Sequence, residues 1–142
     1  MPYDPRLVQP MREELTTLGF TELLTPDDVD AFMSEKGGTA LIVVNSVCGC
    51  AAGMARPGVR LALQQGPRPD RLATVFAGQD VDAVARTRGY FAEMPPSSPS
   101  MALFQDGELV HFVPRHLIEG RTAEQVASDL ASAFDHHCAP AA

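Results

Sequence analysis

Two cysteines separated by one glycine, Cys48 and Cys50, are the residues of this 142-residue chain whose type and spacing most directly indicate chemistry. They follow an apolar, β-branched run at residues 41–44 that is typical of a strand buried on both faces. They also precede a predicted helix, whose unpaired N–H groups favour an anion such as a thiolate. The sequence therefore predicts a redox-active pair, with Cys48 activated and Cys50 close enough to form a disulfide with it.

Two other interpretations of this pair compete with redox chemistry. The thiols could be small buried hydrophobic groups, or they could bind zinc or an iron–sulfur species. A closed structural zinc site needs four ligands, so the metal interpretation requires dimerisation or Cys138. The position of both thiols at a strand-to-helix turn, with Gly49 permitting an unusual backbone, favours the redox interpretation.

Composition narrows the class of protein. Hydrophobic residues make up 45% of the chain, which predicts a single domain with one core. A net charge of -7 without a basic cluster argues against nucleic acid and anionic membranes as partners. No signal-peptide pattern and no run of eighteen apolar residues is found, so we expect a cytosolic protein. Three cysteines, an odd number, do not form a structural disulfide framework.

The elements that must position the cysteines can be predicted from periodicity and capping residues. Their order after residue 38 is β-α-β-α-β-β-α, with a Ser-Pro before the third strand, which is typical of a thioredoxin-like fold. We expect an α/β fold of three layers, a mixed central sheet flanked by helices. Its parts are a helical extension at residues 1–38, a thioredoxin-like core at 39–138 and an unstructured tail at 139–142.

Individual elements follow from local signals. Thr25, Asp80 and Thr122 are predicted helix caps, and Asp106-Gly107 is a predicted hairpin turn. Helices are expected at residues 5–18, from 26 to before Gly37, at 51–65 with a bend near Gly53, Pro57 and Gly58, at 81–88, and from 123 to about 137. Strands are expected at residues 39–45, 72–77, 100–104 and 108–113.

Several motifs together resemble those of the bacilliredoxin family, and they span nearly the whole chain. They are N-S-V-C-G-C-A-A-G-M-A-R-P at residues 45–57, T-V-F-A-G-Q-D at 74–80, P-P-S-S-P-S at 95–100, D-G-E-L-V-H at 106–111 and I-E-G-R at 118–121. The C-G-C block within its flanking residues is far more specific than a bare C-x-C.

The resemblance implies a thiol-disulfide oxidoreductase that removes bacillithiol, a low-molecular-weight thiol, from mixed disulfides on cytosolic proteins. Cys48 would attack, Cys50 or a second bacillithiol would displace the bacillithiol bound to Cys48, and an external reductant would reset the pair. No tightly bound cofactor is implied; bacillithiol is a co-substrate and bacillithiolated proteins are the partners. Some family members are described instead as general disulfide isomerases or oxidoreductases, so that activity remains an alternative. No pattern in the sequence indicates an oligomeric state.

Ser98 and Pro99 are the expected substrate-binding residues. A proline in the trans form before a strand is the ordinary case. Thioredoxin-like folds, however, place a cis proline beside the nucleophilic cysteine, so the resemblance implies a cis bond at Pro99. The backbone of Ser98 would then pair with the backbone of a substrate, as an added strand does.

Six further polar residues and Cys138 are assigned no catalytic role. His136, His137 and Cys138 are interpreted as the end of a helix rather than a metal site. His111 and His116 are interpreted as packing or surface groups rather than as proton donors and acceptors. Arg56 and Arg115 are interpreted either as partners of a carboxylate on bacillithiol or as solvated surface charges.

Overall fold

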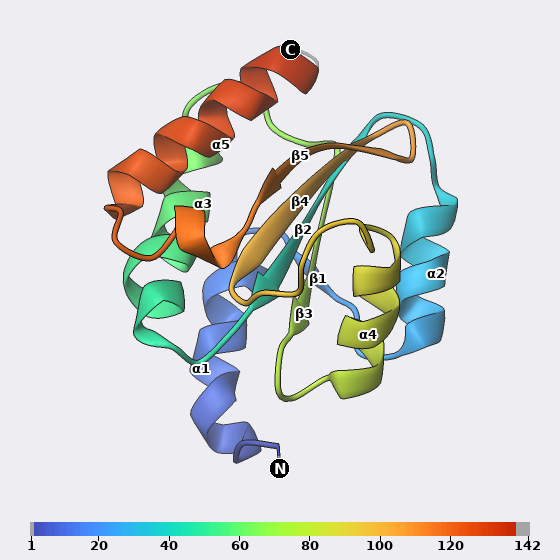
Figure 1. The fold of residues 1–142 in the computed structure, drawn as a ribbon, viewed down its shortest axis with the longest axis vertical. Coiled ribbons are helices and arrows are strands. Elements are labelled where there is room, and N and C mark those ends of the chain that lie inside the picture. The colour runs from blue at the N-terminus through green and yellow to red at the C-terminus, as the bar shows by residue number, and fades with distance from the viewer. Residues whose placement is uncertain (1, 139–142) are drawn as a thin grey trace.

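A mixed sheet of five strands lies between two layers of helices in the computed structural model, which describes residues 2–138 (Figure 1). The strand order is β1-β3-β2-β4-β5; β1, β2 and β3 are parallel, while β4 and β5 are antiparallel to their neighbours. Their bounds are β1 (Thr21–Glu22), β2 (Thr39–Asn45), β3 (Arg71–Phe76), β4 (Ser100–Gln105) and β5 (Glu108–Val113). The predicted tail at 139–142 lies outside the described residues.

Helices cover both faces of this sheet, as expected for the three-layer fold. One layer holds α1 (Pro5–Thr16), α3 (Arg56–Ala62) and α5 (Ala123–His137), and the other holds α2 (Pro26–Ser34) and α4 (Val81–Gly89) (Figure 1). No helix among residues 2–138 is long and apolar enough to cross a membrane.

The central strand β2 is buried along its whole length, which makes it a rigid support for whatever follows it. Leu41 and Val43 pack into the core formed with α1, α3 and α5, whereas Ile42 and Val44 pack into the core formed with α2 and α4. This alternation is the period-two pattern of a strand covered on both sides. Each such side chain contributes about 1.5–3 kcal/mol by leaving water.

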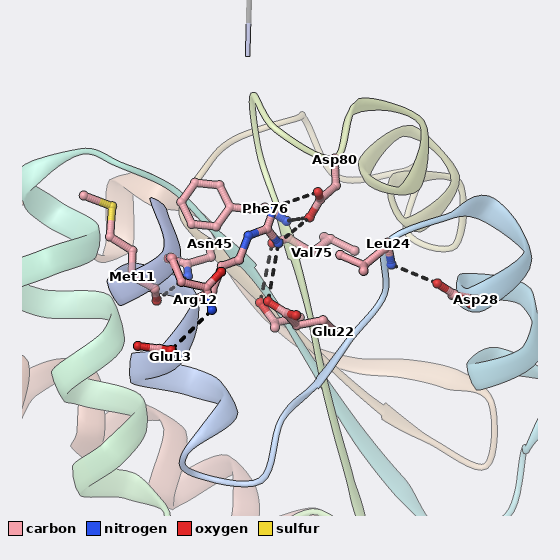
Figure 2. Close-up of polar contacts among 12 residues, drawn as sticks. Met11, Arg12, Glu13, Glu22, Leu24, Asp28, Asn45, Val75, Phe76 and Asp80 are labelled. Atoms are coloured by element: carbon pink, nitrogen blue, oxygen red, sulfur yellow. Dashed lines mark hydrogen bonds and ion pairs between the residues drawn. The ribbon is translucent and has the colours of Figure 1, made fainter. Parts of the chain in front are cut away.

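Two of the three predicted caps are confirmed, and the third has a different role. Thr25 and Thr122 each form a complete capping box at the start of α2 and α5. Asp80 occupies the N-cap position of α4, but its side chain makes no capping hydrogen bond. Its carboxylate instead accepts two hydrogen bonds from Arg12, at 2.8 and 2.9 Å, and one from the Phe76 N–H (Figure 2). Asp80 therefore ties α1 to the carboxyl end of β3.

Two local features differ from the prediction. The region expected to be helical at residues 1–38 also contains β1, whose Thr21 and Glu22 pair with β3; two residues are too few to show a strand period. The helix after the cysteines contains a wider turn, the π-helix η1 (Ala51–Ala55), before α3. Within it the Arg56 N–H bonds to the Ala51 carbonyl, five residues back. The π segment lies in the region where a bend was predicted, near Gly53, Pro57 and Gly58, and such segments are common at functional sites.

Candidate active site

Cys48 and Cys50 lie where β2 ends and a helix begins, as predicted. Helical backbone starts at Gly49, and the Cys48 carbonyl accepts hydrogen bonds from the N–H groups of Ala51 and Ala52, at 3.1 and 3.2 Å. Cys48 is partly exposed, whereas Cys50 is buried with 8% of its surface accessible. A reactant from solvent therefore meets Cys48 first.

The two cysteines are free thiols whose sulfur atoms are 2.7 Å apart. The Ser46 hydroxyl lies 3.3 Å from the Cys48 sulfur, and its oxygen accepts a hydrogen bond from the Cys48 N–H at 3.2 Å. Ser46 belongs to the motif at residues 45–57, but no role was predicted for it. A serine two residues before a reactive cysteine is the signal that could have identified it, because its hydroxyl can reach the following backbone and side chain.

The surroundings shift the acidity of the two thiols in opposite directions. Burial raises the pKa of Cys48, but hydrogen bonds from the Cys50 thiol, the Ser46 hydroxyl and the Ala51 N–H, with the charge of Arg115, outweigh it and leave that pKa below its usual value. Burial, followed by the hydrogen bond to Cys48 and the charge of its thiolate, raises the pKa of Cys50. Of the two thiols, Cys48 is therefore the one that loses its proton at the lower pH.

The loop before β4 lies at the same edge of the sheet as the cysteines. Val44 is paired with Ser100, which places the two preceding residues beside the end of β2. The Ser98–Pro99 peptide bond is cis, as the resemblance implied. The Ser98 carbonyl accepts a hydrogen bond from Arg115 Nη1 at 3.1 Å, so the loop and the cation beside the thiols are joined.

The two arginines considered in the sequence have different surroundings. Arg115, in the 3-10 helix η2 (Arg115–Leu117), has a side chain that is 42% exposed and lies 3.1 Å from Glu119. Arg56 is only 2% exposed. Both interpretations of Arg56, as a surface charge or as a partner for a carboxylate on bacillithiol, are therefore wrong. Its partners are other residues of the fold, which no local sequence pattern reveals.

A groove of about 670 Å³ adjoins this site. Its walls are formed by β5 and by the segment at residues 94–97, and its lining includes Met94, Pro96 and Phe112. Ser97 and Arg115 line the groove, and the Ser97 hydroxyl accepts a hydrogen bond from the Arg115 N–H at 3.2 Å. Arg115 therefore borders both the groove and the thiol pair.

The remaining candidate residues lie apart from the pair or have structural partners. His111 Nε2 is 3.2 Å from Asp129, and His116 is exposed. Cys138 is 7% exposed at the end of α5 and lies near Thr39, where β2 begins. Since β2 has seven residues, about 20 Å separates its two ends. Within residues 2–138, no group of three metal-ligating side chains is placed to hold an ion.

Sequence comparisons identify the family of proteins with this cysteine turn. A family model described as disulphide isomerase matches residues 3–138. A bacilliredoxin from Halalkalibacterium halodurans is 54% identical over 136 residues, which cover 96% of this chain and 94% of that relative. The chain belongs to the bacilliredoxin family. A bacilliredoxin from Cytophaga hutchinsonii is 56% identical over 133 residues, covering 94% of this chain and 98% of that protein.

Membership of the bacilliredoxin family confirms the activity predicted from the C-G-C motif, thiol-disulfide oxidoreduction. Solved structures confirm the thioredoxin-like fold. A thioredoxin from Fasciola hepatica matches with a TM-score of 0.56 and 18% identity over 83% of this chain and 99% of that one. Mitochondrial thioredoxin 3 from Saccharomyces cerevisiae matches with a TM-score of 0.56 and 16% identity over 84% of this chain and 96% of that one.

Proposed function

We propose that this protein removes bacillithiol from mixed disulfides on cytosolic proteins, with Cys48 as the attacking thiol and Cys50 as the resolving thiol. The observation that carries this division of roles is the contrast between the two cysteines. Cys48 is partly exposed and its pKa is lowered, whereas Cys50 is buried and its pKa is raised. A thiolate attacks disulfides and a thiol does not, so Cys48 reacts first.

The cycle consists of two exchanges and a reduction. The Cys48 thiolate attacks the bacillithiol sulfur of the mixed disulfide, which breaks that S–S bond, releases the protein as a thiolate and leaves bacillithiol bound to Cys48. Cys50 loses its proton to solvent and attacks the Cys48 sulfur, which expels bacillithiol as a thiolate and forms the Cys48–Cys50 disulfide. A dithiol, or two molecules of a small thiol, then donates two electrons and two protons to restore both thiols.

Substrate would bind where the cysteine turn, the Ser98–Pro99 loop and the groove meet. The Ser98 backbone is the proposed partner for a substrate backbone, and it would share its carbonyl between that substrate and Arg115. Arg115 is also the proposed cation for a carboxylate of bacillithiol. Glu119 pairs with its Nε and the Ser98 carbonyl with its Nη1, which leaves Nη2 for the ligand. Among residues 2–138, its Nη2 makes no hydrogen bond.

The proposed cycle uses no tightly bound cofactor, because both electrons pass between sulfur atoms. Its partners are bacillithiolated proteins, bacillithiol and an external reductant. The compartment that we propose is the cytosol, where protein thiols are kept reduced and a mixed disulfide is a lesion to be reversed.

General disulfide isomerisation is the second candidate, and the description of the matching family model favours it. The same Cys48 thiolate could attack a disulfide between two protein cysteines. The two activities differ in the second exchange. In one, Cys50 expels a small thiol from Cys48; in isomerisation, another thiol of the substrate attacks the mixed disulfide and expels Cys48 as a thiolate. To separate the two activities, the reduced protein is mixed with one target prepared in three forms: bacillithiolated, glutathionylated or with a scrambled disulfide. The rates of small-thiol release from the first two forms are compared with the rate of refolding of the third.

The roles of the two cysteines are tested by trapping. Cys50→Ser should still attack and then stall, so that mass spectrometry finds bacillithiol attached at Cys48 after reaction with a bacillithiolated target. Cys48→Ser should release none, and Cys138→Ser should behave as the wild type. An adduct on Cys50 in the Cys48→Ser protein would reverse the roles. The absence of an adduct in either variant would contradict the proposed reaction.

A further inference from the structure

A buried guanidinium lies directly beneath the cysteine turn. Arg56 is 2% exposed, and its Nη1 donates hydrogen bonds to Asn45 Oδ1 at 2.9 Å and to the Ser46 carbonyl at 2.8 Å. Its Nε lies 3.2 Å from the Glu14 carboxylate, the counter-charge supplied by α1. A charge taken out of water is costly unless paired and hydrogen-bonded, so these partners hold the guanidinium firmly in one place.

Asn45 extends this arrangement to α1 and to the next residue of the chain. Its Nδ2 donates to the Met11 carbonyl at 3.1 Å (Figure 2), and its Oδ1 accepts from the Ser46 N–H at 2.8 Å. Every polar atom of the Asn45 side chain is therefore engaged on the α1 side of β2. The buried Asn45 and Arg56 connect the N-terminal helix to the start of the cysteine turn.

Ser46 is consequently fixed on both sides. Its N–H is bound by Asn45 and its carbonyl by Arg56, so its backbone cannot rotate without breaking buried hydrogen bonds. That backbone presents the Ser46 hydroxyl to Cys48, 3.3 Å from the sulfur and 3.2 Å from the N–H. Since a hydrogen bond to a thiolate favours the charged form, the orientation of Ser46 affects how reactive Cys48 is.

We propose that Arg56 is a positioning residue for the attacking thiol: its guanidinium, together with Asn45, holds Ser46 so that the Ser46 hydroxyl stays on the Cys48 sulfur. Arg56 acts through Ser46 and does not touch the reacting atoms. The inference rests on the proposed role of Cys48 as the nucleophile. It adds a requirement that the C-G-C motif by itself does not show: the orientation of the thiol's hydrogen-bond partner depends on contacts that reach α1.

The test is a double-mutant cycle read by the pH dependence of Cys48 alkylation, with mass spectrometry to locate the label. Ser46→Ala and Arg56→Gln should each shift the alkylation curve to higher pH and slow alkylation at pH 7 by about threefold, which corresponds to about half a pH unit. Because both changes remove the same hydrogen bond, the double variant should be no slower than Ser46→Ala alone. Cys50 and Arg115 also face Cys48 and stay unchanged in all variants.

Arg60→Gln is the matched control, since Arg60 is an exposed arginine of the same helix, and it should leave the curve unchanged. Denaturation in urea measures stability separately. If Arg56→Gln does not fold, Arg56→Lys replaces it, because lysine keeps the charge but lacks the planar fork that holds several acceptors at once. A folded Arg56 variant with the wild-type alkylation curve, or with a shift that adds to that of Ser46→Ala, would overturn the inference. Alkylation of Cys50 instead of Cys48 in the wild type would contradict the proposed function itself.

Discussion

Arg115 is the cation whose charge acts on both sulfur atoms of the pair. It favours the thiolate form of each thiol and thereby offsets part of the effect of burial, which acts in the opposite direction. Glu119 and the Ser98 carbonyl hold the guanidinium in this position. The reactivity of Cys48 thus depends on a residue 67 positions away in the chain.

Replacing Arg115 with Gln should raise the pKa of Cys48, because removal of a nearby positive charge disfavours the thiolate. The alkylation curve of Cys48 should move to higher pH, and alkylation at pH 7 should slow by about threefold. Arg115→Lys keeps the charge and should lie closer to the wild type. Arg68→Gln removes an exposed arginine before β3, at the opposite end of the sheet, and should change nothing. Equal curves for Arg115→Gln and the wild type would show that the charge is screened by solvent.

Residue types and local spacing were sufficient to predict the two cysteines and their place at the end of a strand. They were insufficient for Arg56, whose partners include Glu14, 42 positions earlier in the sequence. Whether an arginine is buried depends on which distant carboxylate and carbonyl groups the fold brings to it. Ser46 was assigned no role for the same reason: its hydroxyl reaches Cys48 only because Asn45 and Arg56 hold its backbone, and those contacts depend on the fold.

At the scale of elements, the approach of α3 to α5 depends on one glycine. A Cβ atom added at Gly58 would lie 2.7 Å from a methyl carbon of Val126 and 3.2 Å from the Ala123 carbonyl. Neither neighbour can retreat easily, because Val126 is buried at 1% exposure and Ala123 is the first residue of α5. The packing of the helix that follows the cysteines therefore requires glycine at this position.

Gly58→Ala should lower the free energy of unfolding by about 2 kcal/mol, the usual cost of overpacking a buried contact. Gly89→Ala is the matched control, because Gly89 is also helical and nothing lies within 4 Å of an added Cβ. That variant should be neutral or more stable by up to about 1 kcal/mol. Urea denaturation measures both. A Gly58→Ala protein as stable as Gly89→Ala would mean that α3 and α5 can separate without cost.

Long, strongly periodic elements were predicted to within two residues, because β2, α2 and α5 carry both a hydrophobic pattern and a terminal signal. The elements that sequence reasoning missed are β1 and η1. A two-residue strand forms only because β3 offers it an edge, a tertiary contact that overrides local propensity. The π segment has no local sequence pattern that would predict it.

At the scale of the whole molecule, the N-terminal region at residues 2–38 is joined to the sheet by side-chain and backbone contacts. Arg12 and Asp80 join α1 to the sheet, with side chains only 13% and 10% exposed, and β1 adds a strand to the same sheet (Figure 2). Met11 and Glu14 also contact residues beside the cysteine turn. We propose that the N-terminal region and the rest of the described chain unfold as one cooperative unit.

Arg12→Met should therefore destabilise the whole protein, by about 2 kcal/mol, since it leaves the Asp80 carboxylate largely buried without its partner. The unfolding transition should remain single when followed by circular dichroism and by accessibility of the buried Cys138. Arg6→Ala removes a charge that pairs with Asp4 at the surface and should leave stability unchanged. Two separate transitions, with loss of α1 before exposure of Cys138, would show that the extension folds independently.

The distance of 2.7 Å between the two sulfur atoms also has a kinetic consequence. A neighbouring thiol in the same turn acts at an effective concentration far above that of any thiol in solution. Bacillithiol transferred to Cys48 would thus be expelled before a second molecule reached the site. A single turnover should appear as a rapid burst of one target protein thiol and one bacillithiol per enzyme, and every later turnover should wait for re-reduction. The steady rate in a cell would then follow the supply of reductant rather than the number of damaged proteins.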